Sequence, residues 1–350
     1  ATPNARLLTK EEEFTHAMTL GLFDYMSKSW SRGFVVSLSG GADSAACAVL
    51  VSLMIERIER EMGAGGLARL APYLGFDEST RIADLKKGLL FTVYQATKNS
   101  SDTTRHAAET MAKATGARFS VWTIDDLVSQ YRGFIESSLE RELTWEQDDI
   151  TLQNIQARVR APSIWMLTNT LNALLLATSN RSEAAVGYAT MDGDTCGGLS
   201  PIAGIDKAFL RDWLRWLETT GCEDFPPMPE LCVINAQAPT AELRPLEETQ
   251  TDESDLMPYP LLDAIERSAV RDKRSPEEVM REMEVRFAQY SNEQLKTWVK
   301  RFFQLWSRNQ WKRERYAPSF HLDDENLDPK TWCRFPILSG GFRQELEELG

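Results

Sequence analysis

The segment Ser37-Leu38-Ser39-Gly40-Gly41-Ala42-Asp43-Ser44 constrains the fold of this chain more than any other stretch. An apolar, β-branched run over residues 33–36 precedes it and predicts a buried strand. Residues 45–58, rich in Ala, Leu and Met, follow it and predict a helix that packs on a sheet. Two glycines let the turn between this strand and this helix curl so that its N–H groups converge, and the start of the helix adds positive partial charge. The segment therefore predicts a phosphate-binding turn between a strand and a helix.

Other phosphate-loop patterns do not match this segment. A Walker A loop requires a Lys after its glycines, and none follows Gly41. The Gly-rich run at residues 63–68 follows a charged helical segment instead of a strand, so we interpret it as a helix end and loop. The S-G-G-x-D-S string resembles the pattern of the PP-loop ATP pyrophosphatases, which cleave ATP between its α and β phosphates. The alternative is an ordinary Gly-Gly turn capped by Asp43 or Ser44.

Two further strands are predicted downstream of this turn, at residues 89–94 and 118–124. A helix lies between them, from possible N-caps at 99–103 to Ala114, and an amphipathic helix over residues 10–30 precedes the first strand. Strands that alternate with helices pair in parallel through right-handed crossovers. We therefore expect a doubly wound, mostly parallel α/β sheet with helices on both faces. Ligands of such sheets bind outside the carboxyl ends of the strands.

A second polar cluster follows a fourth predicted strand. A long helix over residues 154–173 leads into an apolar strand at 174–178, which ends in the polar run from Thr178 to Glu183. A lone carboxylate at the end of a buried strand is a candidate site residue. The alternative is that Glu183 is only an acidic first-turn residue of the next helix.

The remaining segments are predicted to be loops and helices. Trp213 and Trp216 are expected in the core or in an interface. Residues 311–315 carry the densest positive charge of the chain. They belong either to a functional site or only to a solvated basic face. We expect an ATP-binding α/β unit over residues 1–272, and a helical extension over 273–350 that closes the site. The loops and helices predicted for the rest of the chain are a Gly-rich loop at 187–201, a helix from Lys207, an extended acidic surface loop at 238–263, helical residues 275–307 and an uninformative tail from Asp323.

Charge and cysteine usage narrow the class of protein. A net charge of −13 argues against a general nucleic-acid-binding protein, because phosphate contacts require clustered Lys and Arg. No run approaches ~20 uninterrupted apolar residues, so we expect no membrane-spanning helix. Five cysteines without a C-x-x-C pair favour a reduced, cytoplasmic setting over a disulfide framework. Three scattered histidines argue against a zinc site.

Taken together, the motifs resemble those of NAD synthetases over nearly the whole chain and in the same order. They are the S-G-G-A-D-S turn, N-x-x-A-R-x-R at residues 154–160 and the run at 178–188. Looser details, such as Glu242-Leu243-Arg244-Pro245, are similar to the glutamine-dependent branch, whose members carry an amidohydrolase domain before the synthetase half. This chain begins 38 residues before Ser39 and lacks an initiator Met. We expect the synthetase half of a longer polypeptide or, alternatively, a free-standing enzyme that uses ammonia.

The resemblance implies a reaction and a set of site residues. Deamido-NAD, ATP and ammonia give NAD, AMP and pyrophosphate through an adenylated intermediate, with the nitrogen supplied by a glutaminase domain or subunit. Asp43 and Glu183 are the implied ligands of Mg²⁺, and Lys207 joins them as the third implied catalytic residue. A homodimer or higher homo-oligomer is also expected. The implied ATP-binding residues are Ser37, Leu38, Ser39, Gly40, Gly41, Ala42, Asp43, Ser44, Thr178, Lys207 and Thr240, and the implied deamido-NAD-binding residues are Arg158, Asp194 and Lys312.

Three positions depart from the stand-alone, ammonia-dependent members of this family. Met191 and Gly198 stand where those enzymes place a Lys and an Asp against the dinucleotide, and Trp311 replaces a His. The ATP half of the site is therefore better supported than the deamido-NAD half. Another PP-loop ligase, similar to GMP synthetase or to a tRNA-modifying enzyme, is the alternative function, and a non-catalytic scaffold subunit is the third.

Overall fold

A four-stranded sheet lies at the centre of the computed structural model, which describes residues 7–237, residue 243 and residues 252–350. Its strands stand in the order β3-β2-β1-β4, and every neighbouring pair is parallel. This arrangement confirms the expected α/β fold. The direction of strand succession reverses between β1 and β4, which places a ligand-binding crevice at their carboxyl ends. The strands are β1 (Phe34–Ser37), β2 (Leu90–Ala96), β3 (Arg118–Thr123) and β4 (Leu174–Leu176).

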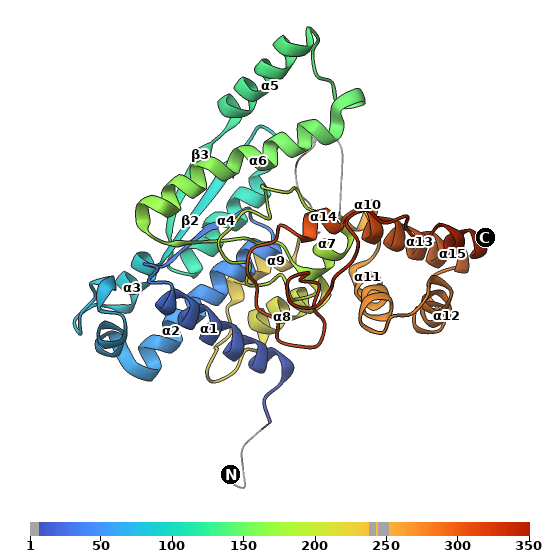
Figure 1. Cartoon of the computed structure of the whole chain (residues 1–350). Helices are drawn as coiled ribbons and strands as arrows, with labels where there is room; N and C mark the ends of the chain where they lie inside the picture. Colours follow the sequence, from blue (N-terminus) through green and yellow to red (C-terminus); the bar gives the residue numbers. More distant parts are fainter. Residues whose placement is uncertain (1–6, 238–242, 244–251) are drawn as a thin grey trace.

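Helices account for most of the remaining described residues (Figure 1). Among these residues, none of the helices is both long enough and apolar enough to span a membrane. In chain order the helices are α1 (Lys10–Lys28), α2 (Ala42–Leu70), α3 (Ile82–Leu89), α4 (Asp102–Ala114), α5 (Asp125–Leu139), α6 (Trp145–Leu171), α7 (Arg181–Val186), α8 (Lys207–Thr219), α9 (Cys232–Asn235), α10 (Asp252–Asp255), α11 (Tyr259–Glu266), α12 (Pro276–Arg286), α13 (Asn292–Arg308), α14 (Gln310–Arg313) and α15 (Arg343–Glu348), with 3-10 turns at Pro72–Leu74 and Pro229–Leu231 and a π-helical turn at Arg267–Arg271.

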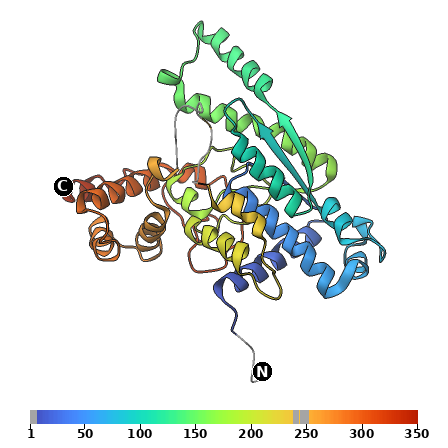
Figure 2. The same ribbon diagram turned by 180° about the vertical axis from the view of Figure 1, so that it is seen from behind.

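Alternating side chains of the strands build a hydrophobic layer on each face of the sheet. Phe34 and Val36 join the larger core, to which α1, α2, α4 and α8 contribute. Val35 points to the opposite face, because successive strand residues alternate, and it packs in a smaller cluster with Ile164 of α6. The two views in Figures 1 and 2 show α6 on one side of the sheet and α2 with α4 on the other. The predicted covering of both faces is confirmed.

A second hydrophobic cluster lies toward the C-terminal end of the chain. It is built by α7, α11, α12 and α13, with Phe302 and Leu262 among its fully buried members. The cluster already includes residues of α7 and α11, which precede residue 273. The division of the chain at residue 272 stays a prediction. Trp213, by contrast, is a confirmed core residue of the first cluster, and its indole N–H donates to Thr15 Oγ1 at 2.9 Å.

Two predicted element boundaries in the first half are wrong. The helix expected to end before the Gly-rich run continues as α2 to Leu70, because Gly63 bends the chain with φ 62° and ψ 175° and the helix resumes beyond it. The burial of Leu67 holds the resumed turns against the core. α6 begins at Trp145, well before the predicted residue 154, and α5 precedes it without having been predicted.

Two predictions in the C-terminal half also need correction. The segment at 238–263 was expected to be extended, but its described part contains α10 and the start of α11. α11 forms because Pro260 stands at its second position, where a proline suits the start of a helix, and because Tyr259, Leu261 and Leu262 are buried. The helical region at 275–307 is two helices, and Ser291 caps the second with a capping box.

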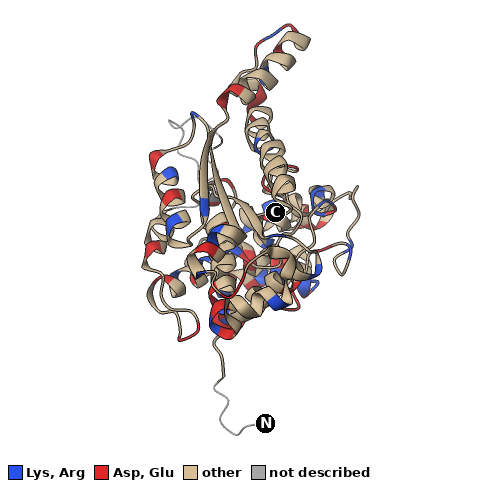
Figure 3. Cartoon of the chain, turned by 90° about the vertical axis from the view of Figure 1, so that its left-hand side faces the viewer, with Lys and Arg blue, Asp and Glu red and all other residues tan. Residues whose placement is uncertain are grey.

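α5 and the first turns of α6 form an arm that projects beyond the rest of the molecule (Figure 3). No residue of α5 is buried. Its exposed side chains include Tyr131, Phe134, Ile135 and Leu139, of which Phe134 is 66% exposed. Contiguous exposed apolar side chains mark interaction surfaces on soluble proteins.

Candidate active site

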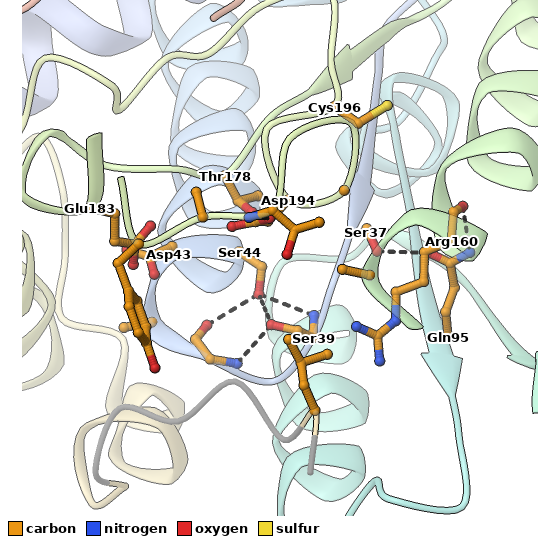
Figure 4. Close-up of a pocket in the computed structure, with 18 of the residues that line it drawn as sticks. Ser37, Ser39, Asp43, Ser44, Gln95, Arg160, Thr178, Glu183, Asp194 and Cys196 are labelled. Carbon is orange, nitrogen blue, oxygen red and sulfur yellow. Dashed lines mark hydrogen bonds between the residues drawn. The ribbon is translucent and has the colours of Figure 1, made fainter. Parts of the chain in front are cut away.

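A cavity of about 590 Å³ opens where β1 and β4 end. Its walls come from the turn after β1, from α6, from the loop after β4 and from α8. Figure 4 shows Asp43 and Glu183 on one side of it, Ser37, Gln95 and Arg160 on the other, and Ser39 with Ser44 between them. The polar cluster at the end of β4 and the turn after β1 therefore face the same space, as their positions at the carboxyl ends of parallel strands predict.

Side-chain hydroxyls fix the shape of the turn after β1. The Ser39 N–H and hydroxyl both bond the Ser44 hydroxyl, at 3.1 and 3.0 Å, and the Gly41 N–H donates to Ser39 Oγ at 3.3 Å. Gly40 has φ +86°, and a Cβ there would lie 2.1 Å from the Thr104 carbonyl oxygen of α4. Only glycine fits that position, because α4 packs directly against the turn.

Most of the predicted ATP-binding residues line this cavity. Leu38 and Gly40 do not, since Leu38 is fully buried beneath the turn and Gly40 packs on α4. Thr240 lies outside the described residues. The lining members of the predicted set are Ser37, Ser39, Gly41, Ala42, Asp43, Ser44, Thr178 and Lys207.

Asp43, Glu183 and Lys207 converge from three different helices. The Lys207 ammonium is buried, contacts Asp43 Oδ2 and lies 3.4 Å from Glu183 Oε1. Asn180 Nδ2 donates to the other Asp43 oxygen at 3.1 Å. Asn180 also caps α7 in a capping box with Glu183, which confirms the alternative reading of Glu183 as a first-turn acid, while its role as a site residue stays a prediction.

The carboxylate pair fits a hard divalent cation. Mg²⁺ is usually held by one or two carboxylates together with substrate phosphates and water, and the ammonium between Asp43 and Glu183 shows that a cation is accommodated there. Within the described part of the chain, no cluster of three or more His, Cys, Asp or Glu side chains could hold a metal ion on its own. Phosphate oxygens would have to complete such a site.

The predicted dinucleotide residues are placed differently from one another. Asp194 and Lys312 line the cavity, whereas Arg158 does not and instead donates from Nε to the Met191 carbonyl at 3.0 Å. Arg160, two residues further along α6, lines the cavity in its place. The Arg160 carbonyl accepts a hydrogen bond from Gln95 Nε2 at 2.9 Å.

Burial changes the acid–base properties of two of these groups. Burial raises the pKa of Asp194 to about 6, although the Thr190 N–H at 2.7 Å and the nearby Lys312 and Arg160 charges oppose the rise. Burial lowers the pKa of Lys312, and the Asp194 charge opposes that shift. The Lys312 ammonium donates to the carbonyls of Gly187 and Ala189, at 2.6 and 2.8 Å.

A buried ionic network supports the site from behind α7. The Arg181 guanidinium is 1% exposed and contacts Glu266 at 3.1 Å, Glu325 at 2.7 Å and Asp206 at 3.2 Å. Burial raises the pKa of Glu266 to about 7, while the Arg181 charge works in the opposite direction. Glu325 belongs to the tail that carried no sequence signal, and it is 3% exposed. This network places α7, and with it Glu183, against the C-terminal tail.

Sequence reasoning missed two basic lining residues. Arg160 is the second arginine of the N-x-x-A-R-x-R motif, so the motif itself contained the signal. Arg211 lies four residues after Lys207, a spacing that puts both side chains on one face of α8.

Comparison with known proteins assigns this fold and site to a family. The model of the NAD synthase family matches residues 14–315. This chain belongs to the NAD synthase family. The match covers both the turn at Ser39 and Lys312, and it confirms the resemblance inferred from the motifs.

Among NAD synthase relatives, the glutamine-dependent NAD(+) synthetase of Aquifex aeolicus is 30% identical over 334 residues, which is 95% of this chain and 49% of that protein. A crystal structure of a glutamine-dependent NAD(+) synthetase from Cytophaga hutchinsonii is 48% identical, with a TM-score of 0.85, and the match covers 98% of this chain and 56% of that one. An NH3-dependent NAD synthetase from Campylobacter jejuni is 18% identical with a TM-score of 0.53, over 87% of this chain and 96% of that one, and shares the fold. The chain thus spans about half the length of the curated relatives it matches.

Proposed function

We propose that the chain amidates deamido-NAD to NAD at the expense of ATP, through an adenylated intermediate, and releases AMP and pyrophosphate. One observation carries this proposal. Asp43 and Glu183 face each other across the end of the S-G-G-x-D-S turn, in a chain of the NAD synthase family. A turn built for pyrophosphate beside paired hard ligands suits cleavage of ATP between its α and β phosphates.

The chemistry requires positioning and charge stabilisation from this chain. An oxygen of the nicotinate carboxylate attacks the α-phosphorus, and the bond from that phosphorus to the bridging oxygen breaks, so that the electron pair leaves with pyrophosphate. Ammonia then displaces AMP from the mixed anhydride and loses a proton. No protein nucleophile takes part. The N–H groups of Gly41 and Ala42 at the start of α2, with the Ser39 and Ser44 hydroxyls, would bind the leaving pyrophosphate.

The metal and the ammonium have complementary roles. Asp43 and Glu183 would hold Mg²⁺, which when bound supplies positive charge to the phosphate oxygens. Lys207, at the first position of α8, would exchange its contact with these carboxylates for one with phosphate. Thr178 and Thr240 complete the proposed ATP contacts.

The dinucleotide half of the site draws on α6, the loop after β4 and the C-terminal extension. We assign Arg158, Asp194 and Lys312 to deamido-NAD, and Arg160 joins them because it lines the cavity. Lys312 lies in α14, beyond residue 272, and its bonds to the Gly187 and Ala189 carbonyls support a role of the extension in closing the site.

The relatives and the arm support proposals for the nitrogen source and the assembly. Ammonia would come from a glutaminase domain or subunit, since the relatives from Aquifex aeolicus and Cytophaga hutchinsonii are glutamine-dependent enzymes about twice as long. The exposed apolar face of α5 would pair with a second copy to give a homodimer or a higher homo-oligomer. The five free cysteines agree with a cytoplasmic location.

A product analysis tests the proposal. The purified chain is incubated with ATP, Mg²⁺, deamido-NAD and ammonium salt, and we expect NAD, AMP and pyrophosphate in equal amounts. Formation of ADP instead of AMP would refute it. Replacing deamido-NAD by xanthosine monophosphate or by unmodified tRNA tests the alternative PP-loop ligases, and turnover with either substrate in place of deamido-NAD also contradicts the proposal.

A further inference from the structure

Arg211 is a basic side chain of the cavity that has no partner among the described residues. Four basic residues line the cavity among the described residues, and the other three are engaged. Lys207 contacts two carboxylates, Lys312 donates to two carbonyls, and Arg160 also has interaction partners. For Arg211, the described part of the chain provides neither a hydrogen bond nor an ion pair, although the residue is only partly exposed.

The position of Arg211 points to the phosphate end of the cavity. It follows Lys207 by one turn of α8, so the two side chains lie on the same face of the helix, about 6 Å apart along its axis. The neighbouring helix α9 ends beside the glycine turn, where Gln237 Nε2 lies 3.5 Å from the Gly40 carbonyl. Gly41, Asn235 and Arg211 line the same cavity. Arg211 therefore faces the cavity that the glycine turn and the end of α9 also line.

A guanidinium in that position has a defined chemistry. Arginine presents donors in a planar fork that binds phosphate oxygens in pairs, and it stays charged at every relevant pH. We propose that Arg211 binds the terminal phosphate of ATP and holds the pyrophosphate as it leaves. The inference rests on the proposed function for its reaction. Its binding site stands on the cavity and on a guanidinium without a partner in the described part of the chain.

The proposal assigns different roles to Lys207 and Arg211, the two basic residues of α8 that line the cavity. Lys207 stands at the carboxylates, where the α-phosphorus would react, and Arg211 stands one turn away, toward the end of the triphosphate. Negative charge moves onto the leaving pyrophosphate when the bond to the α-phosphorus breaks. A donor that meets this charge contributes more in the transition state than in the ground state.

Binding measurements on the full 350-residue chain test the inference directly. Isothermal titration of inorganic pyrophosphate and of AMP is compared for the unchanged chain, Arg211→Gln and Arg211→Lys. We expect Arg211→Gln to weaken pyrophosphate at least tenfold and to leave AMP within twofold, with an intermediate value for Arg211→Lys. Arg215→Gln is the matched control, because Arg215 lies one turn further on α8, is 51% exposed and pairs with Asp212.

Turnover provides a second readout. In the amidation assay, kcat/KM for ATP should fall about 10²- to 10³-fold in Arg211→Gln, as for other single electrostatic donors, and Arg215→Gln should match the unchanged chain. Equal pyrophosphate affinity in Arg211→Gln and Arg215→Gln overturns the inference, as does a parallel loss of AMP affinity. If the unchanged chain binds pyrophosphate through Arg211 but makes no NAD, the proposed function fails and the phosphate site stands. Circular dichroism of each variant checks that a loss does not come from unfolding.

Discussion

Replacing Arg181 by Met tests how the buried ionic network holds α7. The guanidinium is 1% exposed and lies between Glu266 and Glu325, which are 1% and 3% exposed. Methionine keeps much of the side-chain volume but removes the positive charge. Glu266 then stays buried without its arginine, whereas Glu325 keeps its contacts with Arg267 and Arg271. Breaking a buried pair in this way costs about 3–5 kcal/mol of unfolding free energy. We expect a loss in that range for Arg181→Met near pH 8.

The loss should depend on pH, because Glu266 can take up a proton. Its pKa in the folded chain is about 7, above the ordinary value of 4.5, since burial outweighs the attraction of Arg181. The contribution of Glu266 to the stability of the unchanged chain therefore falls as pH rises from about 4.5 to about 7 and is level above that. Without Arg181 the folded pKa rises further, so the variant keeps losing stability above pH 7. The difference between the two proteins should grow by up to about 1.4 kcal/mol per pH unit there.

Urea unfolding at pH 6 and pH 8.5 measures both effects, with the m-value checked for two-state behaviour. Arg215→Met is the control for losing an exposed arginine, for which less than about 1 kcal/mol is expected. Adding Glu266→Gln to Arg181→Met should recover part of the loss, because the unpaired buried charge is then gone. A loss below about 1 kcal/mol, or an equal loss at the two pH values, would refute the reasoning.

Three further predictions concern the site and the arm. Asp43→Asn should lower kcat/KM for NAD formation about 10²- to 10³-fold with little change in the unfolding midpoint, and unchanged turnover would exclude a metal role for Asp43. Because Asp194 ionises near pH 6, kcat/KM for deamido-NAD should rise through about pH 6, and Asp194→Asn should remove that rise; an identical profile in the variant contradicts the assignment. If the arms pair as proposed, the unchanged chain is a homo-oligomer by light scattering and Phe134→Lys is monomeric, and a monomeric unchanged chain would disprove the pairing.

Local sequence was sufficient to predict the features that local physics determines. The strands after residues 33 and 173 are apolar runs, which are expected in a buried sheet. The turn at Gly40 requires a positive φ, which glycine adopts readily. α5 escaped prediction although Leu127, Tyr131, Phe134 and Ile135 recur at helical spacing, and in the structure this apolar face is exposed. Gly63 was taken for a helix end, and only the burial of Leu67 beyond it explains why the helix resumes.

Side-chain direction and distant partners were beyond what the sequence could predict. Arg158 and Arg160 are two residues apart on α6 and cannot face the same way, so the packing of the helix decides which one reaches the cavity. Arg181 and Glu325 are 144 positions apart, and neither signals the other along the chain. The carboxylates of Asp43 and Glu183 were paired through family resemblance alone, and the structure brings both to one ammonium.

The close contact between Gly40 and Thr104 has a consequence for protein engineering. The turn cannot be transferred to another protein on its own, because its conformation at Gly40 depends on the neighbouring helix α4 as well as on its own glycines. A graft of residues 37–44 onto another strand and helix would need an α4 equivalent at the same distance, or the turn would relax. Substitutions on the turn-facing side of α4 should accordingly be as damaging to nucleotide binding as changes within the turn itself.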